Sequence, residues 1–333
     1  MNTLVKIFSA LFIFFLFLVG CTKEEPVKIG FLIHDLDKER WENDKDYFVE
    51  KVKELGGTVE VRIANNDAEK QMQQAEELLQ NGSDVLVIIP VDQFAASEIV
   101  NKATEKDVNV ISYDRLIKNC HLDFYVSTDN VEIGKLQAEY LTTIKPTGKY
   151  ALIGGAERDN NSKFLYLGQM NVLQPLVERG DIEIVYNEFT NAWKEEEGYE
   201  HTKRILQTTP DVDAIIAGND AIAIGAINAL HEAGKENDVL VAGMDADLRN
   251  LQEIVAGHQT CTVYKPYEKL ASTAAEIAMK LANNEESGRT YQTVSNGEML
   301  VPAVLHEAMI VNRENLKLTV ISEGYQTEEE VFR

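Results

Sequence analysis

Polar and aromatic side chains follow almost every predicted strand of this chain, at positions where a parallel sheet gathers functional groups. In open α/β sheets, ligands bind beyond the carboxyl ends of the strands, so these side chains are the first candidates for a binding site. They are Arg40, Trp41, Asp114, Arg115, Asp159, Asn161, Trp193, Asn219, Asp245 and Lys265, with His34 as a further candidate. Their spacing matches neither a zinc site nor an EF-hand loop, and we predict no metal and no cofactor.

The chemistry of this set suits a sugar. Hydroxyl groups both donate and accept hydrogen bonds, so they match carboxylates, carboxamides and guanidinium groups placed together. Bonds to charged partners are the stronger ones. The C–H face of a pyranose ring suits a flat indole. The chain has two tryptophans, Trp41 and Trp193, one in each half. We therefore expect a monosaccharide to be held between two domains.

Each candidate also has a purely structural interpretation. An Asn or Asp before a helix commonly caps it, which would account for Asn161, Asp220 and Asp247. A single tryptophan commonly belongs to a core, and the pair at 114–115 has the composition of a surface ion pair of little energetic weight. We favour a binding site over these structural roles because nearly every predicted strand end carries such a residue.

The elements that must position these residues alternate between strands and helices. Apolar runs predict strands at 27–33, 58–64, 85–89, 109–113, 123–127, 150–153, 182–189, 214–217, 240–243 and 259–264. Helical spacing predicts helices over 40–55, 67–80, 94–106, 162–179, 194–207, 220–233, 248–256 and 267–281, and the tail has short strands at 301–305 and 309–311. This alternation over two similar halves predicts an α/β fold of two doubly wound, Rossmann-like domains.

The first 21 residues have the pattern of an export signal. Lys6 precedes an apolar run over 7–19, which is shorter than the ~20 residues of a membrane-spanning helix. Cys21 directly follows, as in bacterial lipoprotein signals. We expect residues 1–21 to be a lipoprotein signal peptide, Cys21 to carry the lipid, and residues 22–26 to be a tether. The protein would then lie at the periplasmic or extracellular face of the cell envelope, anchored to a membrane; an uncleaved anchor is the alternative.

Charge and cysteine content narrow the possible partners and cross-links of the protein. The 333 residues carry a formal net charge of -23, and removal of Lys6 with the signal gives -24. Such an acidic chain repels phosphate backbones, so we predict no nucleic-acid partner. Apart from Cys21, the expected lipid site, the chain has two cysteines, Cys120 and Cys261. They form no disulfide framework, and their spacing does not decide whether they pair.

The chain resembles the sugar-binding receptors of ABC importers, the ribose- and xylose-binding family of type 1 periplasmic binding proteins. The matching stretches run from about residue 28 to the end and include ERW at 39–41, DVLVIIP at 84–90, YDR at 113–115, DNN at 159–161, NDA at 219–221, DAD at 245–247 and TVYKP at 262–266. The resemblance implies two lobes joined by a three-segment hinge. The first would hold 27–127 plus 265–294, and the second 128–264 plus 295–333.

The resemblance also implies a role for each candidate. The two tryptophans would stack on the pyranose ring, and the other residues would bind its hydroxyls. From the first lobe these are Arg40, Asp114 and Arg115; from the second, Asp159, Asn161, Asn219 and Asp245; beside the hinge, Lys265.

Two residues depart from the family pattern. His34 stands where the family has an acidic residue, and Asp37 where it has a basic one. A neutral imidazole accepts one hydrogen bond and donates one, unlike a carboxylate, so the identity of the preferred sugar stays open. His34 also has a purely structural interpretation, as a residue that packs behind the site without contacting the ligand.

These expectations together describe a receptor and not an enzyme. It would close around a monosaccharide, most simply D-xylose or a related aldose, and deliver it to an ABC permease in the membrane. A sensory subunit that presents the sugar to a membrane kinase would have the same cleft, and a receptor for another small polyol stays open. A glycosidase lacks support because no carboxylate pair is evidently poised as acid and base. A repressor of the same fold would need a basic DNA-reading headpiece.

Overall fold

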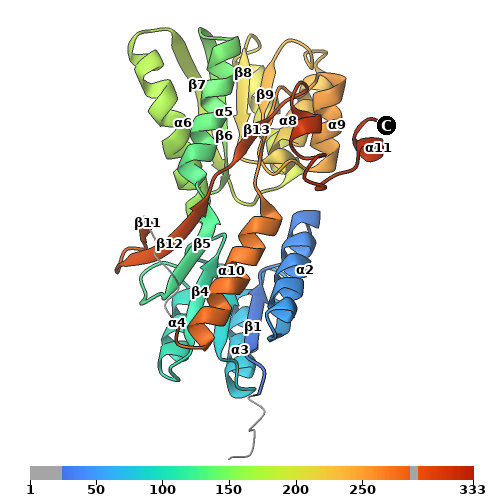
Figure 1. Ribbon diagram of the computed structural model, residues 1–333. Coiled ribbons are helices and arrows are strands. Elements are labelled where there is room, and N and C mark those ends of the chain that lie inside the picture. Colours follow the sequence, from blue (N-terminus) through green and yellow to red (C-terminus); the bar gives the residue numbers. More distant parts are fainter. Residues whose placement is uncertain (1–24, 286–291) are drawn as a thin grey trace, which may run out of the picture.

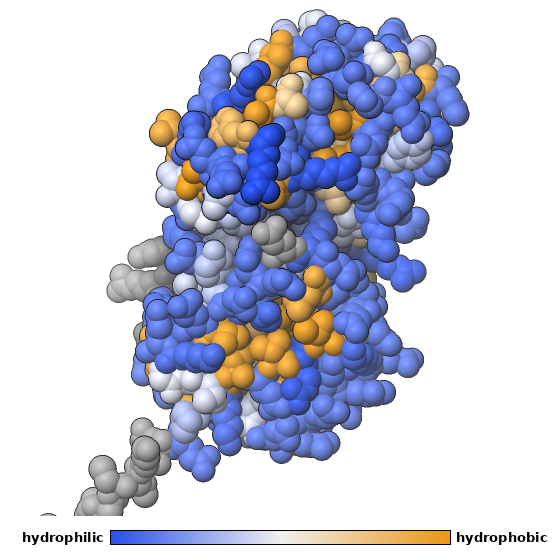
Figure 2. Space-filling view, turned by 90° about the vertical axis from the view of Figure 1, so that its right-hand side faces the viewer, coloured by the Kyte–Doolittle hydropathy of each residue, from blue (hydrophilic) through white to orange (hydrophobic). Residues whose placement is uncertain are grey.

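The computed structural model describes residues 25–285 and 292–333, which form two α/β lobes joined by a hinge (Figure 1). The predicted signal segment, with Cys21, lies outside the described residues. Hydrophilic side chains cover most of the face shown in Figure 2, in keeping with the acidic composition.

The first lobe is built on a seven-stranded sheet in the order β11-β12-β5-β4-β3-β1-β2. Its strands are β1 (Lys28–Ile33), β2 (Thr58–Ile63), β3 (Val85–Ile88), β4 (Asn109–Tyr113), β5 (Phe124–Thr128), β11 (Gln292–Ser295) and β12 (Leu300–His306). All neighbours are parallel except β11 and β12. Strand β3 is buried along its whole length, as expected for a parallel sheet covered on both faces.

Helices cover both faces of this sheet. Successive strand residues point to opposite faces, so Phe31 packs with α2 (Glu39–Glu54) and α10 (Tyr267–Ala282), while Leu32 packs with α3 (Ala68–Gln80) and α4 (Ala96–Thr104). Helix α10, which follows the second lobe in sequence, thus returns to complete the core of the first lobe.

The second lobe has a four-stranded parallel sheet in the order β7-β6-β8-β9. Its strands are β6 (Gly148–Ala156), β7 (Ile182–Thr190), β8 (Ala214–Ala217) and β9 (Leu240–Ala242). An isolated bridge from Ala242 to Cys261 continues it to an antiparallel pair, β10 (Thr262–Tyr264) with β13 (Met309–Val311). The helices are α5 (Asn130–Ile144), α6 (Asn160–Glu178), α7 (Glu195–Thr208), α8 (Asp220–Glu232) and α9 (Leu248–Ala256), with η1 (Leu316–Leu318) and α11 (Glu328–Val331) in the tail.

The chain crosses between the lobes three times: after β5, between β10 and α10, and between β12 and β13. A bond from the Asp129 amide to the His306 carbonyl (3.0 Å) joins two of these crossings. Strand β12 extends the first sheet by pairing with β5, for example Ala303 with Tyr125. The sequence-based boundary at 294/295 is therefore wrong for this segment, which enters the second lobe only after His306.

Three further observations bear on function. Cys120 and Cys261 are both free and buried, one in each lobe, so they do not form a disulfide. Among the residues that the structure describes, no helix has the length and apolarity needed to cross a bilayer. The same part of the chain contains no cluster of side chains suited to hold a metal ion.

Candidate ligand-binding cleft

All eleven residues singled out from the sequence line one cavity of about 420 Å³, which both lobes enclose. They arrive there because the carboxyl ends of both parallel sheets face the region between the two lobes (Figure 1). His34 follows β1, Asp114 follows β4, and Asn219 follows β8. The fold thus brings together residues that are up to 231 positions apart in the sequence, from His34 to Lys265.

Arg40 occupies the centre of the polar network. It lies in the first turn of α2, is only 2% exposed, and reaches carboxylates in both lobes. Its Nη2 donates to Asp114 Oδ2 (2.8 Å) and to Asp44 Oδ2 (3.3 Å), and its Nη1 donates to Asp245 Oδ1 (3.4 Å). Its Cζ lies 3.8 Å from the centroid of the Trp41 ring. Four neighbours therefore fix the plane of this guanidinium.

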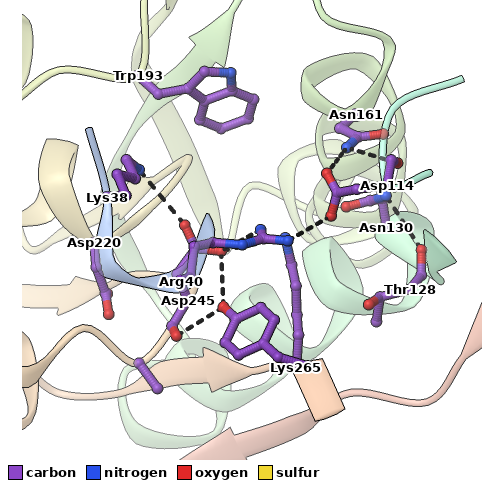
Figure 3. A network of polar contacts seen from close by, with 12 residues as sticks. Lys38, Arg40, Asp114, Thr128, Asn130, Asn161, Trp193, Asp220, Asp245 and Lys265 are labelled. Carbon is purple, nitrogen blue, oxygen red and sulfur yellow. Dashed lines mark hydrogen bonds and ion pairs between the residues drawn. The ribbon is translucent and has the colours of Figure 1, made fainter. Parts of the chain in front are cut away.

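Asp245 lies close to three cations of the cleft, Lys38, Arg40 and Lys265. It lies in a turn after β9 at φ +108°, a left-handed backbone that side chains other than glycine rarely adopt. Lys265 Nζ lies 3.2 Å from Oδ1 and Lys38 Nζ 3.7 Å from Oδ2 (Figure 3). Burial alone would raise the pKa of Asp245, but attraction to Lys265, Lys38 and Arg40 outweighs it and lowers that pKa. The carboxylate is therefore ionised at neutral pH.

Asp114 makes a second connection between the lobes. Asn161, from α6 of the second lobe, donates through Nδ2 to Asp114 Oδ1 (3.2 Å) and to its main-chain carbonyl (3.3 Å). Burial acts to raise the pKa of Asp114, but Arg40 and Lys265 hold it well below its ordinary value. The cleft therefore presents ionised carboxylates from both sides.

Asp159 makes a third connection and has two roles. Its Oδ1 accepts from the Asn161 amide (2.9 Å) as the N-cap of α6. Its Oδ2 lies 3.1 Å from Arg115 Nε of the first lobe and accepts from Trp193 Nε1 (3.2 Å). Asn219 likewise caps α8, with Oδ1 accepting from the Ile222 amide (3.0 Å). The same residues therefore cap helices and line the cleft. The caps of α6 and α8 are Asp159 and Asn219. The capping interpretation of the sequence had instead assigned these roles to Asn161 and Asp220.

The two tryptophans line the same cavity but are held differently. Trp41 is 5% exposed and belongs to the core of the first lobe. Trp193 is half-buried and lies against Gly155, where an added Cβ would come within 2.0 Å of two ring carbons. Only glycine allows so close an approach of indole and main chain. Gly155 thus sets the position of the Trp193 ring.

His34 meets Trp41 edge-to-face, with ring centroids 4.6 Å apart. It is 2% exposed, and burial, followed by the nearby Arg115 and Arg40, places its pKa well below the ordinary value. The imidazole is therefore neutral at physiological pH. Its Nδ1 has no hydrogen-bond partner among the described residues.

The sequence analysis missed cavity residues that lie on loops away from strand ends. Lys38, Asn66, Gln93 and Arg158 are examples. Gln93 Nε2 donates to the carbonyl of Arg158 (2.5 Å), a further contact between the lobes. A signal existed for Lys38, which stands two residues before Arg40, but a lysine in a charged loop is common on surfaces and did not stand out.

Comparison with known proteins places this architecture in a family. The model of a periplasmic binding protein domain matches residues 29–286. The D-xylose-binding periplasmic proteins of Escherichia coli (strain K12) and Haemophilus influenzae are 44% and 42% identical, each over 92% of this chain and 93% of their own. A solved ABC transporter solute-binding protein from Clostridium phytofermentans with bound β-D-glucose is 28% identical, with a TM-score of 0.84 over 91% of this chain and 99% of that one. The chain belongs to the periplasmic binding proteins, a family that binds ligands and does not transform them.

Proposed function

We propose that this protein is an extracytoplasmic receptor that closes around a monosaccharide, D-xylose or a related aldopyranose, and delivers it to an ABC permease. The observation that carries the proposal is a set of buried polar atoms without a protein partner on residues that line the cavity. Arg40 Nε, Asn161 Oδ1 and Asn219 Nδ2 are such atoms among the described residues. Because buried polar groups are almost always hydrogen-bonded, these atoms suit a ligand that supplies both donors and acceptors.

The charges of the lining favour a neutral ligand. Its cations are Lys38, Arg40, Arg115, Arg158, Lys194 and Lys265, and its carboxylates are Asp35, Asp37, Asp114, Asp159 and Asp245. The two signs nearly cancel, so neither a sugar phosphate nor a free amine gains from the field of the cleft. Hydroxyl groups suit this lining because they bond to both signs of charge.

The relatives support the choice of sugar and transport route. The proteins named as D-xylose-binding match nearly the whole chain at more than 40% identity.

The contacts of Arg40, Arg115 and Asn161 across the cleft exist only with the lobes close together. Ligand contacts on both lobes would shift the balance toward that closed form, and hinge closure is the motion of periplasmic binding proteins as a group.

Titration calorimetry on residues 22–333 tests the proposal directly. We expect saturable binding of D-xylose or another neutral aldopyranose with a Kd of about 1 µM or tighter, near -8 kcal/mol. Glucuronate and glucosamine serve as charged controls and should bind more weakly than glucose. Failure of every neutral pentose and hexose to bind would contradict the proposed ligand class.

The Gly155→Ala variant tests the placement of Trp193. The new methyl group would meet the indole at 2.0 Å, so the ring must move. Overpacking of this kind typically costs about 1–3 kcal/mol, and we expect roughly a tenfold or greater loss of D-xylose affinity with the fold retained. Calorimetry measures the affinity, and circular dichroism checks the fold. Wild-type affinity would show that the ring position does not matter for binding.

We also propose that Cys21 is lipidated and holds the receptor at a membrane. The support is the signal pattern of residues 1–21, since two acyl chains give stable attachment where one is marginal. Labelling with a fatty-acid analogue and fractionation should place the wild type in membranes and Cys21→Ala in the soluble fraction. Cys120→Ala is the matched control, because Cys120 is buried and free. Equal labelling of wild type and Cys21→Ala would exclude this anchor.

A further inference from the structure

A buried carboxylate stands behind the centre of the cleft. Asp44 lies in α2, one turn after Arg40, and is 0% exposed. Asp44 does not belong to the described residues that line the cavity. Its two oxygens have different partners: Oδ2 accepts from Arg40 Nη2 (3.3 Å), and Oδ1 accepts from the Tyr113 hydroxyl (2.8 Å). The expected set of ligand contacts assigns it no role.

The hydrogen-bond donors of Arg40 indicate a role for Asp44. A guanidinium has five N–H donors in a fixed plane. Nη2 is shared between Asp44 and Asp114, and Nη1 reaches Asp245 across the cleft. Without Asp44, Nη2 would lose its acceptor on the side away from the cavity, and Asp114, Asp245 and Trp41 alone would hold the group. The bond to Asp44 is therefore a hydrogen-bond restraint from behind on where Nε and the remaining Nη1 hydrogen point.

We propose that Asp44 is a positioning residue for ligand binding, which fixes the guanidinium of Arg40 from behind while Tyr113 fixes Asp44. This inference rests on the proposed sugar-binding function. Its consequence is that affinity depends on the ionisation of a carboxylate that does not contact the ligand.

The surroundings of Asp44 make that ionisation titratable. The groups that face it are Arg40 and Tyr47 from α2, and Tyr113 and Asp114 from the end of β4. Tyr267 of α10 lies beside the same guanidinium, 4.6 Å from ring centroid to Cζ. Burial raises the pKa of Asp44 to about 6, although Arg40 and the Tyr113 hydroxyl act to lower it.

The other groups near Arg40 do not titrate in the same range. Asp114 and Asp245 have lowered pKa values and stay ionised, and His34 has a lowered pKa and stays neutral. Since affinity needs the ionised form of Asp44, it is present above the pKa of Asp44 and falls as pH drops through it. By linkage, bound ligand must lower that pKa.

The Asp44→Asn variant tests the proposal with D-xylose as the probe. Asparagine has one acceptor oxygen and no charge, whereas the carboxylate accepts from Tyr113 and Arg40 through separate oxygens. We therefore expect affinity at pH 7.5 to fall about 10- to 100-fold, the range for a bond to a charged group. Wild-type affinity should drop between pH 7 and pH 5, and the variant should lack this drop. Asp46→Asn is the control, because Asp46 lies on the same helix with a 73% exposed side chain.

Tyr113→Phe provides a second readout. The hydroxyl of Tyr113 acts to lower the pKa of Asp44, so its removal should shift the loss of affinity to higher pH. A purely structural role would not move this midpoint. The proposal is overturned if folded Asp44→Asn binds like the wild type, or if Tyr113→Phe leaves the pH profile unchanged. If the wild type itself binds no monosaccharide, the proposed function fails instead.

Discussion

Replacing Trp193 with alanine is expected to weaken D-xylose binding by roughly 30- to 150-fold while the second lobe stays folded. An indole buries ~150–250 Å², and one face of it, about half of that area, is worth about 2–3 kcal/mol at ~25 cal/mol per Å². The side chain is half-buried and lies at the edge of two apolar clusters, outside their buried centres. Its loss should therefore affect binding much more than the free energy of unfolding.

Trp193→Phe separates stacking from hydrogen bonding. Phenylalanine keeps a flat apolar face but cannot donate to Asp159 Oδ2, which still has Arg115 as a partner. We expect this variant to bind with an affinity between those of the wild type and Trp193→Ala. Calorimetry gives the affinities, and urea unfolding gives the stabilities. An unchanged Kd for Trp193→Ala would remove the indole from the binding site.

Replacing Arg40 with alanine is expected to abolish measurable binding and to lower the free energy of unfolding by about 3–5 kcal/mol, the usual cost of breaking a buried ion pair. Asp44, Asp114 and Asp245 would lose a shared cation inside the protein. Trp41 would also lose the guanidinium that lies 3.8 Å from its ring centroid. Urea unfolding followed by circular dichroism measures the loss.

The pH dependence of this loss has a definite sign. In the wild type, Asp114 has a lowered pKa, so its contribution to stability is present above its unfolded pKa and is lost as pH falls. Without Arg40, burial would raise the pKa values of these carboxyls, and protonation would relieve the cost. The difference in stability between wild type and variant should therefore be smaller at pH 5 than at pH 7.

Arg249→Ala is the matched control for Arg40→Ala. Arg249 pairs with Glu195 at 2.9 Å, but its side chain is 51% exposed. An exposed ion pair contributes about 0–1 kcal/mol, so this variant should unfold and bind like the wild type. Equal stability of the two arginine variants would contradict a buried network centred on Arg40.

The sequence predicted most of the fold because strands and helices of an α/β protein have strong local patterns. Strand β3 is apolar throughout, and α3 begins after its cap Asp67. Helix α5 was missed, since no element was predicted between residues 127 and 150, although Asp129 caps it. The place of β12 in the first sheet depends on pairing with β5, a contact between distant segments that no local pattern reveals.

The candidate cleft was predictable for a similar reason. A parallel sheet brings its strand ends to one edge, so reading the residues that follow each strand found eleven of those that line the cavity. Asp44 escaped this reading because it lies inside α2, where a charged residue ordinarily faces solvent. Its burial follows only from how α2, β4 and α10 pack together.

The return of α10 and β12 to the first lobe has a consequence for biosynthesis. Helix α10 covers one face of the first sheet, and β12 extends it beyond β5. A nascent chain therefore cannot finish its earliest domain until about residue 306 has emerged, which is most of its 333 residues. A polypeptide that threads through a narrow translocation channel benefits from this delay, because its first lobe cannot complete its fold until nearly the whole chain is available.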